Sequence, residues 1–298
     1  MRLDDYRESQ NVEQDSGGGG GGGFGGGGGG LGMIFGLIAS RFGIGGIIVL
    51  AIGMMIFGMN PLSLIGGGTG TGTQQVPRTG QTAQQVCDAD PAHKFSCQVL
   101  ASTEDTWTKL FQQQGKQYRP ATLHFYVSQG QSGCGAAQSA MGPFYCPTDQ
   151  RVYLDTEFFD ELSNRFHAAG DFAQAYVIAH EVGHNVQYLT GTADKVRAQQ
   201  QQAGEAGANA LQVKMELQAD CYAGVWAANN RDRLEPGDVE EGMRAANSIG
   251  DDTLQRSAGK TPMPDSFTHG SSAERMAWLK RGLDSGDPAQ CDTFSGAI

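Results

Sequence analysis

The 298-residue sequence predicts an α+β fold, in which a small strand region is followed by helices and preceded by one transmembrane helix. Three observations lead to this prediction. Strand-like alternation is confined to short segments before residue 157, helical patterns dominate the chain after it, and a charge-free apolar run lies near the amino end. Short strands followed by a series of helices are typical of α+β domains, where the two kinds of element are segregated.

The first 85 residues predict a tail, a membrane span and a linker. Residues 1–40 are expected to be a disordered cytoplasmic tail, since 13 of the 45 glycines lie between Gly17 and Gly30 and offer no side chains to bury. Residues 41–65 include 17 uncharged residues, GIGGIIVLAIGMMIFGM, which with their flanks reach the roughly 30 Å of a bilayer core. The alternatives are a buried core helix or a secretory signal, although a signal sequence normally starts closer to the N-terminus. Residues 66–85, rich in Gly, Thr and Gln, are expected to be a linker.

Charged residues predict the orientation of this span and narrow the range of partners. Arg2, Arg7 and Arg41 precede the apolar run, and the next basic residue is Arg78. Because basic flanks favour the cytoplasmic side, we expect a cytoplasmic N-terminus and an exported domain at residues 86–298. The formal net charge of −11 makes nucleic acid an unfavourable partner, since an acidic domain repels phosphate backbones.

All six cysteines follow the apolar run. An even number on the exported side suits disulfide formation in an oxidising compartment, and six cysteines allow 15 pairings. Six reduced, buried thiols are the alternative, and a cysteine zinc knuckle is disfavoured because no CxxC pair occurs. We expect each cysteine to pair with its neighbour in the sequence, Cys87 with Cys97, Cys134 with Cys146, and Cys221 with Cys291.

Residues 86–298 show strand patterns first and helical patterns afterwards. The spacing of Trp107, Leu110 and Phe111 predicts a helix over 102–114, and alternation predicts short strands at 121–127 and 151–154. Further helices are expected at residues 157–168, 172–189, 209–228, 236–248 and 272–283. Asp171 and Gly191 are suited to capping the helix at 172–189. Ser271 and Glu274 have the spacing of a capping box at the last helix.

The predicted helix at 172–189 contains the sequence HEVGH. His180 and His184 are four residues apart, so on a helix both imidazoles project from one face and can reach a single Zn²⁺. Glu181 is rotated by about 100° around the helix axis, where its carboxylate can activate a metal-bound water without binding the metal. Two histidines that match the motif by chance are the alternative, but a polar triad on so apolar a helix is costly to bury without a metal.

A third metal ligand is required, because two histidines leave a zinc site incomplete. The extended HExxHxxGxxH pattern is absent, since Gln187 stands three residues after His184 and the next histidine is His269. Glu216 is the expected third ligand, and Asp220, one helical turn later, is expected to accept a hydrogen bond from a ligand imidazole. Glu205 is the rival ligand, and two solvated helix-surface carboxylates are the alternative interpretation.

HEVGH followed by ELQAD (Glu216 to Asp220) resembles the gluzincins, zinc peptidases with HExxH and a later glutamate helix. More narrowly, the chain resembles the neutral zinc metallopeptidase family of bacterial membrane-anchored proteins. The matching stretches are Arg7, Ser9, Asn11, Val12 and Glu13, then GCGAAQSAMGPFYCPTDQRVYLD (Gly133 to Asp155), the two zinc helices, and THGSSAERMAWLKRG (Thr268 to Gly282). The family usually has a short charged run after the residues that match Asn11, Val12 and Glu13, whereas this chain has a polyglycine tract there. The resemblance implies a zincin-like domain at residues 86–298 on a bacterial inner membrane.

Two further residues are candidates for catalysis. His269 precedes a capped helix and could stabilise the charge that develops on a substrate carbonyl. Related membrane metallopeptidases carry a histidine and an arginine in a similar stretch, which points also to Arg275; a cap-region histidine and a structural ion pair are the alternatives. Tyr222 is a weaker candidate. The stretch 135–142 suits either a sheet edge that binds an extended substrate or an ordinary loop.

The sequence therefore predicts a zinc-dependent endopeptidase that acts on a peptide or protein substrate. A zinc hydrolase of a cell-wall amide would use the same residues and is one alternative. A non-catalytic membrane-tethered binding or assembly factor with the same fold is another, although such a protein would not need Glu181. Substrate preference and oligomeric state are not indicated by the sequence.

Overall fold

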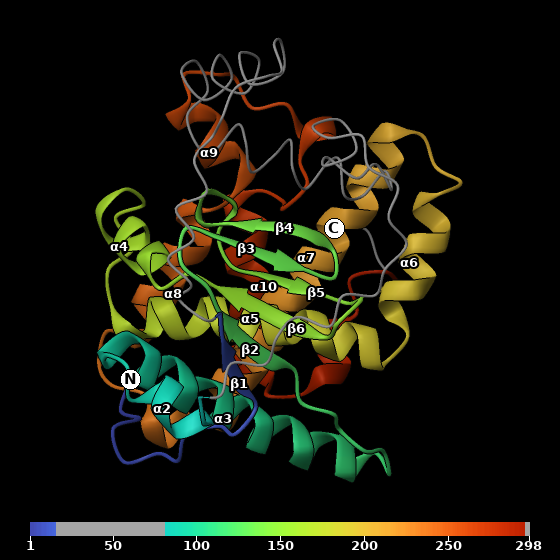
Figure 1. Cartoon of the computed structure of the whole chain (residues 1–298). Coiled ribbons are helices and arrows are strands. Elements are labelled where there is room, and N and C mark those ends of the chain that lie inside the picture. Colours follow the sequence, from blue (N-terminus) through green and yellow to red (C-terminus); the bar gives the residue numbers. More distant parts are fainter. Residues whose placement is uncertain (16–80, 296–298) are drawn as a thin grey trace, which may run out of the picture.

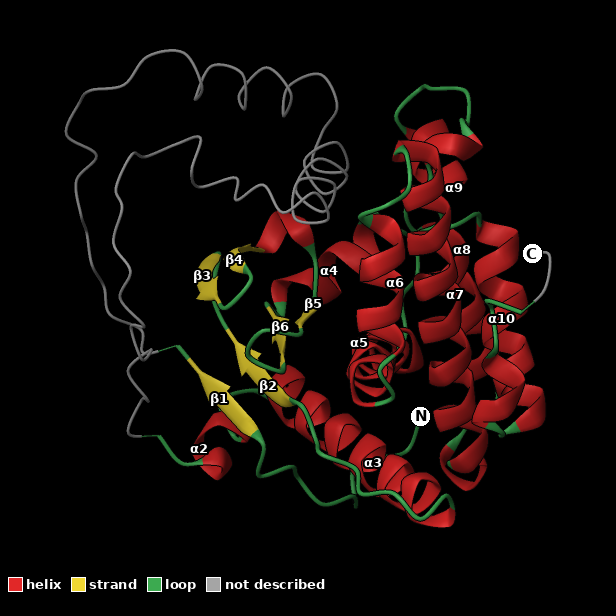
Figure 2. Ribbon diagram, turned by 90° about the vertical axis from the view of Figure 1, so that its right-hand side faces the viewer, coloured by secondary structure: helices red, strands yellow, loops and turns green. Residues whose placement is uncertain are grey.

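The computed structural model describes residues 1–15 and 81–295 of the chain (Figure 1). Within these ranges the expected α+β class is confirmed, with a small sheet beside a larger group of helices (Figure 2). The strands are β1 (Val12–Gln14), β2 (Thr122–Phe125), β3 (Gln129–Ser132), β4 (Gly135–Gln138), β5 (Phe144–Cys146) and β6 (Arg151–Leu154). The α-helices are α2 (Ala83–Cys87), α3 (Pro91–Gln113), α4 (Glu157–Asn164), α5 (Asp171–Leu189), α6 (Thr192–Gln200), α7 (Glu205–Asn229), α8 (Asp238–Ser248), α9 (Asp251–Ser257) and α10 (Ser272–Ser285).

The main sheet has the strand order β1-β2-β6-β5. The first three strands run parallel, and β5 is an antiparallel edge strand. Leu123 and Phe125 of β2 and their register partners on β6 belong to the core shared with the helices. Because side chains alternate along a strand, His124 and Tyr153 lie on the other face, where their rings contact each other. The excursion between the predicted strands forms β5 and a separate hairpin of β3 and β4.

The helices form layers on one side of the sheet (Figure 2). Helices α3 and α5 lie next to the sheet, α7 packs on α5, and α10 packs on α7, while α8 contacts both α5 and α10. Glycines allow the closest approaches. A Cβ atom added at Gly183 of α5 would lie 3.1 Å from the Cα of Ala219 on α7, and one added at Gly282 of α10 would lie 1.9 Å from the backbone oxygen of Cys221. The backbones of α5 and α7 therefore nearly touch, which brings their facing side chains together.

Helix ends follow local capping chemistry. Helix α3 begins at Pro91, well before the predicted start at 102, because Asp90 caps it by accepting from the backbone N–H of His93 at 2.9 Å. The capping box of Ser271 and Glu274 is confirmed. Asp171 is not the cap of α5: Gly170 holds that position, and Asp171 lies in the first turn. Helices α6 and α9 were not predicted.

Residues 1–15 pack against the rest of the domain, so the prediction of a disordered tail is wrong for this stretch. Strand β1 pairs with β2, and the side chains of Leu3 and Ser9 are buried. The prediction followed the glycine run, which begins only at Gly17, and overlooked the apolar and hydrogen-bonding residues before it. The predicted linker also ends early, because Thr82 and Gln85 form a capping box at the start of α2.

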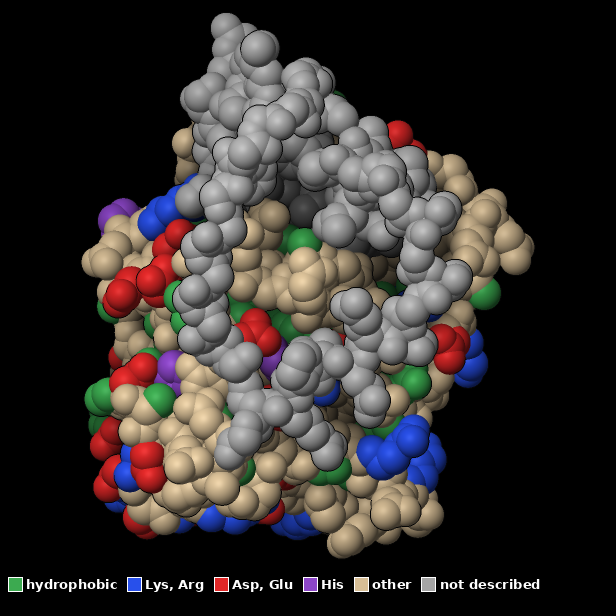
Figure 3. Space-filling model, viewed as in Figure 1, with side chains coloured by type: hydrophobic (Ala, Val, Ile, Leu, Met, Phe, Trp, Pro, Cys, Tyr) green, Lys and Arg blue, Asp and Glu red, His purple; other side chains and the backbone are tan. Residues whose placement is uncertain are grey.

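The rest of the predicted tail, the span at 41–65 and the linker up to residue 80 lie outside the described ranges. Within those ranges no helix combines the length and apolarity needed to cross a bilayer. On the face shown in Figure 3, acidic and basic side chains are interspersed over the described part of the chain. The net negative charge is therefore not gathered in one area of that face.

Three disulfides confirm the predicted pairing of sequence neighbours. Cys87 pairs with Cys97, Cys134 with Cys146, and Cys221 with Cys291. The first joins α2 to α3, the second joins the hairpin turn to β5, and the third joins α7 to the C-terminal residues. Each bond therefore cross-links two elements, and the alternative of six reduced thiols is excluded in this structure.

Candidate metal centre

The two histidines of the HEVGH sequence lie on the buried face of α5. Their rings are one helical turn apart, with centroids 4.9 Å from each other and planes nearly perpendicular. The helix is apolar around them, since Val177, Ile178 and Val182 belong to the core. Gly183 stands between the histidines and allows α7 to approach. The same sequence that makes α5 a core helix therefore turns both imidazoles toward α7.

Glu216 of α7 meets both imidazoles. Its Oε2 atom lies 3.1 Å from Nε2 of His180 and 3.7 Å from Nε2 of His184. Ligand atoms about 2.0–2.1 Å from a tetrahedral zinc lie roughly 3.3 Å from one another. The three donor atoms therefore have the spacing and chemistry of a His₂Glu zinc site, and they form one of two closely spaced ligand groups among the described residues.

The second group consists of Asp171, Asp238 and Glu241. Two of its carboxylates are already paired, because the Met1 amino group lies 2.5 Å from Asp171 and 3.0 Å from Asp238. It holds no histidine, so it lacks the nitrogen ligands that zinc prefers. The His180 group is the one that matches the sequence motif.

Asp220 holds the ring of His180 from behind. Its Oδ1 atom is 2.8 Å from Nδ1 of His180 and accepts a 2.6 Å hydrogen bond from the Tyr176 hydroxyl. Arg275 of α10 donates to both carboxylate oxygens at 2.9 Å. A carboxylate on Nδ1 leaves Nε2 as the metal-binding nitrogen, which is the usual arrangement behind zinc ligands. Arg275 contacts this carboxylate, not the candidate ligand atoms.

Gln187 has the same role for His184. Its Oε1 atom lies 2.8 Å from Nδ1 of that ring, and its Nε2 donates to the backbone oxygen of Met215 at 2.7 Å. In the sequence, Gln187 stands at the glycine position of the extended HExxHxxGxxH pattern, and no role at the site was predicted for it. Its position three residues after His184, on the same face of the helix, is the signal that could have identified it.

Burial and neighbouring carboxylates perturb the pKa values of the ligand set. Burial opposes the charged form of His180, but Asp220 and Glu216 outweigh this effect and raise its pKa to about 10. Burial opposes ionisation of Glu216, yet the two imidazoles hold its pKa well below the ordinary value. The buried carboxylate of Glu216 is therefore stabilised by positive charge on the imidazoles. A bound cation would supply the same positive charge.

Glu181 is buried beside these ligands. Burial raises its pKa above the ordinary value, while the two histidines and a backbone hydrogen bond from Tyr145 of β5 act in the opposite direction. A carboxylate with a raised pKa is suited to accept and then return a proton near neutral pH. The edge strand β5 therefore contacts the residue that would do this chemistry.

His269 is oriented by Asp251, a carboxylate for which the sequence predicted no role. Nδ1 of the ring is 3.2 Å from Oδ1 of Asp251, and Oδ2 of Asp251 accepts backbone hydrogen bonds from Thr268, His269 and Gly270. Burial opposes the charged form of His269, but Asp251 and, more weakly, Glu216 raise its pKa. The backbone donors fix Asp251 firmly. No local motif around Asp251 indicated this contact, which depends on the packing of α9.

Two other candidates lie away from the centre. Glu205, the rival ligand, is exposed at the first residue of α7, several turns before Glu216. Tyr222 belongs to the core, where its ring packs edge-on against Trp107 with centroids 5.3 Å apart. Of the predicted site residues, the structure brings together His180, Glu181, His184, Glu216, Asp220 and Arg275, with His269 close by.

The chain is similar to known proteins over most of its length. The chain is 49% identical over 258 residues to the uncharacterized protein YpfJ of Escherichia coli K12, covering 86% of this chain and 88% of YpfJ. It is 40% identical over 225 residues to the uncharacterized protein Rv2575 of Mycobacterium tuberculosis H37Rv, covering 70% and 74%. No solved structure matches. The family described as "Putative neutral zinc metallopeptidase" matches residues 1–294, and the chain therefore belongs to this family.

Proposed function

We propose that this protein is a zinc-dependent endopeptidase with a zincin-like active site. The observation that carries the proposal is the convergence of His180, His184 and Glu216 on one point beside Glu181. Two imidazoles and one carboxylate leave a fourth position open, which is typical of catalytic and not of structural zinc sites. A Zn²⁺ bound there supplies a Lewis acid and activates water at neutral pH.

Glu181 acts as the general base. It takes the proton of the attacking water and passes it to the departing amine, the two transfers that peptide hydrolysis requires. Its burial supports this role, because a raised pKa brings the carboxyl group closer to the pH at which it must both gain and lose a proton. A scaffold protein would have no use for such a group.

The remaining residues orient the metal ligands or stabilise the charge that develops on the substrate. Asp220 and Gln187 fix the rings of His180 and His184, and Arg275 acts by holding Asp220 in place. His269, held by Asp251, donates a hydrogen bond to the substrate carbonyl oxygen as negative charge develops on it. Arg275 is therefore assigned a positioning role.

The test uses the purified full-length chain and three variants, one of them a control. Wild type is expected to bind one Zn²⁺ and to cleave casein or a peptide library, and Glu181→Gln is expected to keep the zinc and lose turnover. Glu216→Gln is expected to lose zinc, whereas Glu205→Gln, an exposed position at the start of the same helix, should keep both zinc and activity. Full activity in Glu181→Gln would refute the assignment.

The same experiment distinguishes the other two functions. Zinc binding with cleavage of peptidoglycan fragments but of no peptide in the library would indicate an amidase of cell-wall material. Zinc binding without hydrolysis of either substrate would indicate a binding or assembly factor. Both outcomes would contradict the proposed peptidase.

A further inference from the structure

Residues 1–15, here called the amino-terminal segment, contact three separate parts of the domain. The backbone N–H of Arg2 donates to the carbonyl oxygen of Arg233, just after α7, at 2.8 Å. Residues 7–11 lie along α3, and β1 extends the sheet beside β2. Leu3 is 1% exposed and belongs to the main core. The segment is therefore part of the packed domain although the described chain resumes only at residue 81.

Glu104 of α3 is a buried carboxylate that the amino-terminal segment satisfies. It accepts hydrogen bonds from Arg7 at 2.9 Å, from the Ser9 hydroxyl at 2.5 Å and from the Asn11 side chain at 2.8 Å. Among the described residues, these are the hydrogen bonds made by its side chain, and Glu104 is 6% exposed. A buried charge without partners is strongly unfavourable. The side chain of Glu104 is therefore favourably buried only when the amino-terminal segment is docked on α3.

His124 of β2 shows the same dependence. It is 3% exposed, and its Nε2 atom lies 2.9 Å from Oδ1 of Asp15. The next charge near it is also on the segment, Glu13, whose carboxylate is 3.7 Å from Nδ1 and pairs with Arg151 at 2.9 Å. Strand β1 also pairs with β2, whose backbone groups would otherwise form an open sheet edge. Two buried polar side chains and one strand edge are thus matched to residues 7–15.

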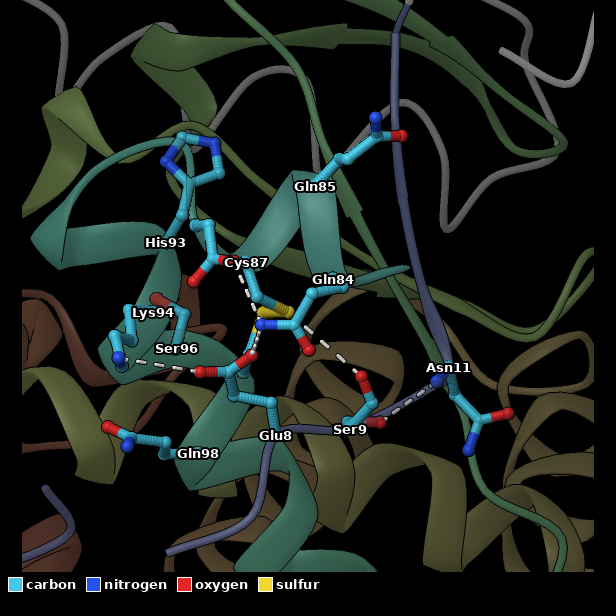
Figure 4. The surroundings of a disulfide bond; sticks show 12 residues. Glu8, Ser9, Asn11, Gln84, Gln85, Cys87, His93, Lys94, Ser96 and Gln98 are labelled. Carbon is cyan, nitrogen blue, oxygen red and sulfur yellow. Dashed lines mark hydrogen bonds and ion pairs between the residues drawn. A yellow bond between two sulfur atoms is a disulfide. The ribbon is translucent and has the colours of Figure 1, made fainter. Parts of the chain in front are cut away.

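The segment also lies on a disulfide of the domain (Figure 4). The backbone N–H of Ser9 donates to the carbonyl oxygen of Cys97 at 3.2 Å, and the Cys87 sulfur lies 4.0 Å from the carbonyl oxygen of Ser9. Glu8 contacts Gln84 of α2 and Lys94 of α3, the two helices that this disulfide joins. The segment is therefore docked on a surface whose form depends on an oxidised cysteine pair.

We propose that the amino-terminal segment and the disulfide-bonded domain of residues 81–295 occupy the same compartment, with the segment serving as a structural strand of the domain. A single membrane crossing between them would keep Arg7, Ser9 and Asn11 from reaching Glu104. The proposal thus replaces the cytoplasmic position expected from Arg2, Arg7 and Arg41. It does not depend on peptidase activity, because none of the contacts involves the metal centre.

The first test is the docking of the segment in the full-length, membrane-extracted chain. The six native cysteines are paired, so an added cysteine reports its own surroundings. Gln10→Cys, at an exposed position, should react with a polar maleimide at once, whereas Val12→Cys, 7% exposed, should react at least about tenfold more slowly until denaturant is added. Equal rapid reaction of both would overturn the proposal.

The second test compares compartments in cells that express the full chain. Gln10→Cys and Ser257→Cys, an exposed position at the end of α9, are treated with a membrane-impermeant maleimide before and after permeabilisation. The proposal requires both to be labelled under the same condition, and a cytosolic cysteine protein reports membrane integrity. Labelling of one before permeabilisation and of the other only afterwards would overturn it.

Discussion

Oδ1 of Asp220 lies 2.8 Å from Nδ1 of His180, so a carboxylate of α7 fixes the ring of a candidate ligand on α5. Arg275 of α10 holds the same carboxylate through two hydrogen bonds of 2.9 Å. All three side chains are buried. The orientation of one imidazole is therefore coupled to the packing of three helices.

Replacing Asp220 with Asn should weaken the metal centre and the fold together. We expect zinc affinity to fall about 10–100-fold because the ring of His180 loses its carboxylate partner. The free energy of unfolding should fall by about 3–5 kcal/mol, since the buried Arg275 is left without its counter-charge. Competition titration with a chelator and denaturant unfolding measure the two effects. Asp232→Asn, whose side chain is 81% exposed, is the control that should change neither.

Replacing His269 with Gln should affect turnover and leave metal binding intact. The ring is held by Asp251 and not by the ligand set, so zinc content is expected to stay at the wild-type level. Loss of one donor to a developing oxyanion typically lowers kcat about 10²–10³-fold. Steady-state kinetics on a cleaved peptide measure this change. A purely structural His269 would instead lower stability with kcat unchanged in the folded fraction, and this result would contradict the assigned role.

The metal-free protein should lose stability as the pH rises. The pKa of His180 is raised from 6.5 to about 10 in the folded chain. A group whose pKa is raised by folding stabilises the protein fully below its unfolded pKa, and this contribution is lost as the pH rises through the folded pKa. The chelated protein should therefore become less stable between pH 6.5 and about 10.

Zinc should reverse this trend, because it binds the neutral imidazole and displaces protons, so its affinity rises with pH. Thermal unfolding of chelated and zinc-loaded protein across pH 6.5 to 9.5, an interval within the approximate limits set by His180, measures both trends. His180→Asn should remove this part of the pH dependence from the chelated protein. A chelated wild-type protein equally stable across this interval would contradict the prediction.

Replacing Gly183 with Ala should disturb the metal centre through the backbone. The added Cβ would lie 3.1 Å from both the Cα and the backbone oxygen of Ala219, so α5 and α7 must move apart by a few tenths of an ångström. We expect a loss of about 1–3 kcal/mol in stability, as for other overpacked core positions, together with weaker zinc binding. Gly207→Ala, an exposed glycine of α7, is the matched control and should be neutral or stabilising by up to about 1 kcal/mol.

Local patterns in the sequence were sufficient to predict which residues lie at the centre of the site. His180, Glu181 and His184 share a helix, and Glu216 and Asp220 share another, so helical periodicity alone places each group on one face. The pairing of the cysteines is confirmed as expected, although the sequence left other pairings open. The α+β class, the strand at Arg151–Leu154 and the capping box at Ser271 followed from the sequence and are also confirmed. Each depends on residues close together in the chain or on the order of elements.

The tertiary structure alone decided the contacts between distant residues. Asp251 reaches His269, and the amino-terminal segment reaches Glu104 and His124, across separations that no local pattern records. The glycine run dominated the composition of the first 40 residues and concealed a short strand, because three residues of β1 carry too little periodicity to be recognised alone. Periodicity describes which face a residue takes on its own element, whereas the partner of that face is chosen by the packing of the whole chain.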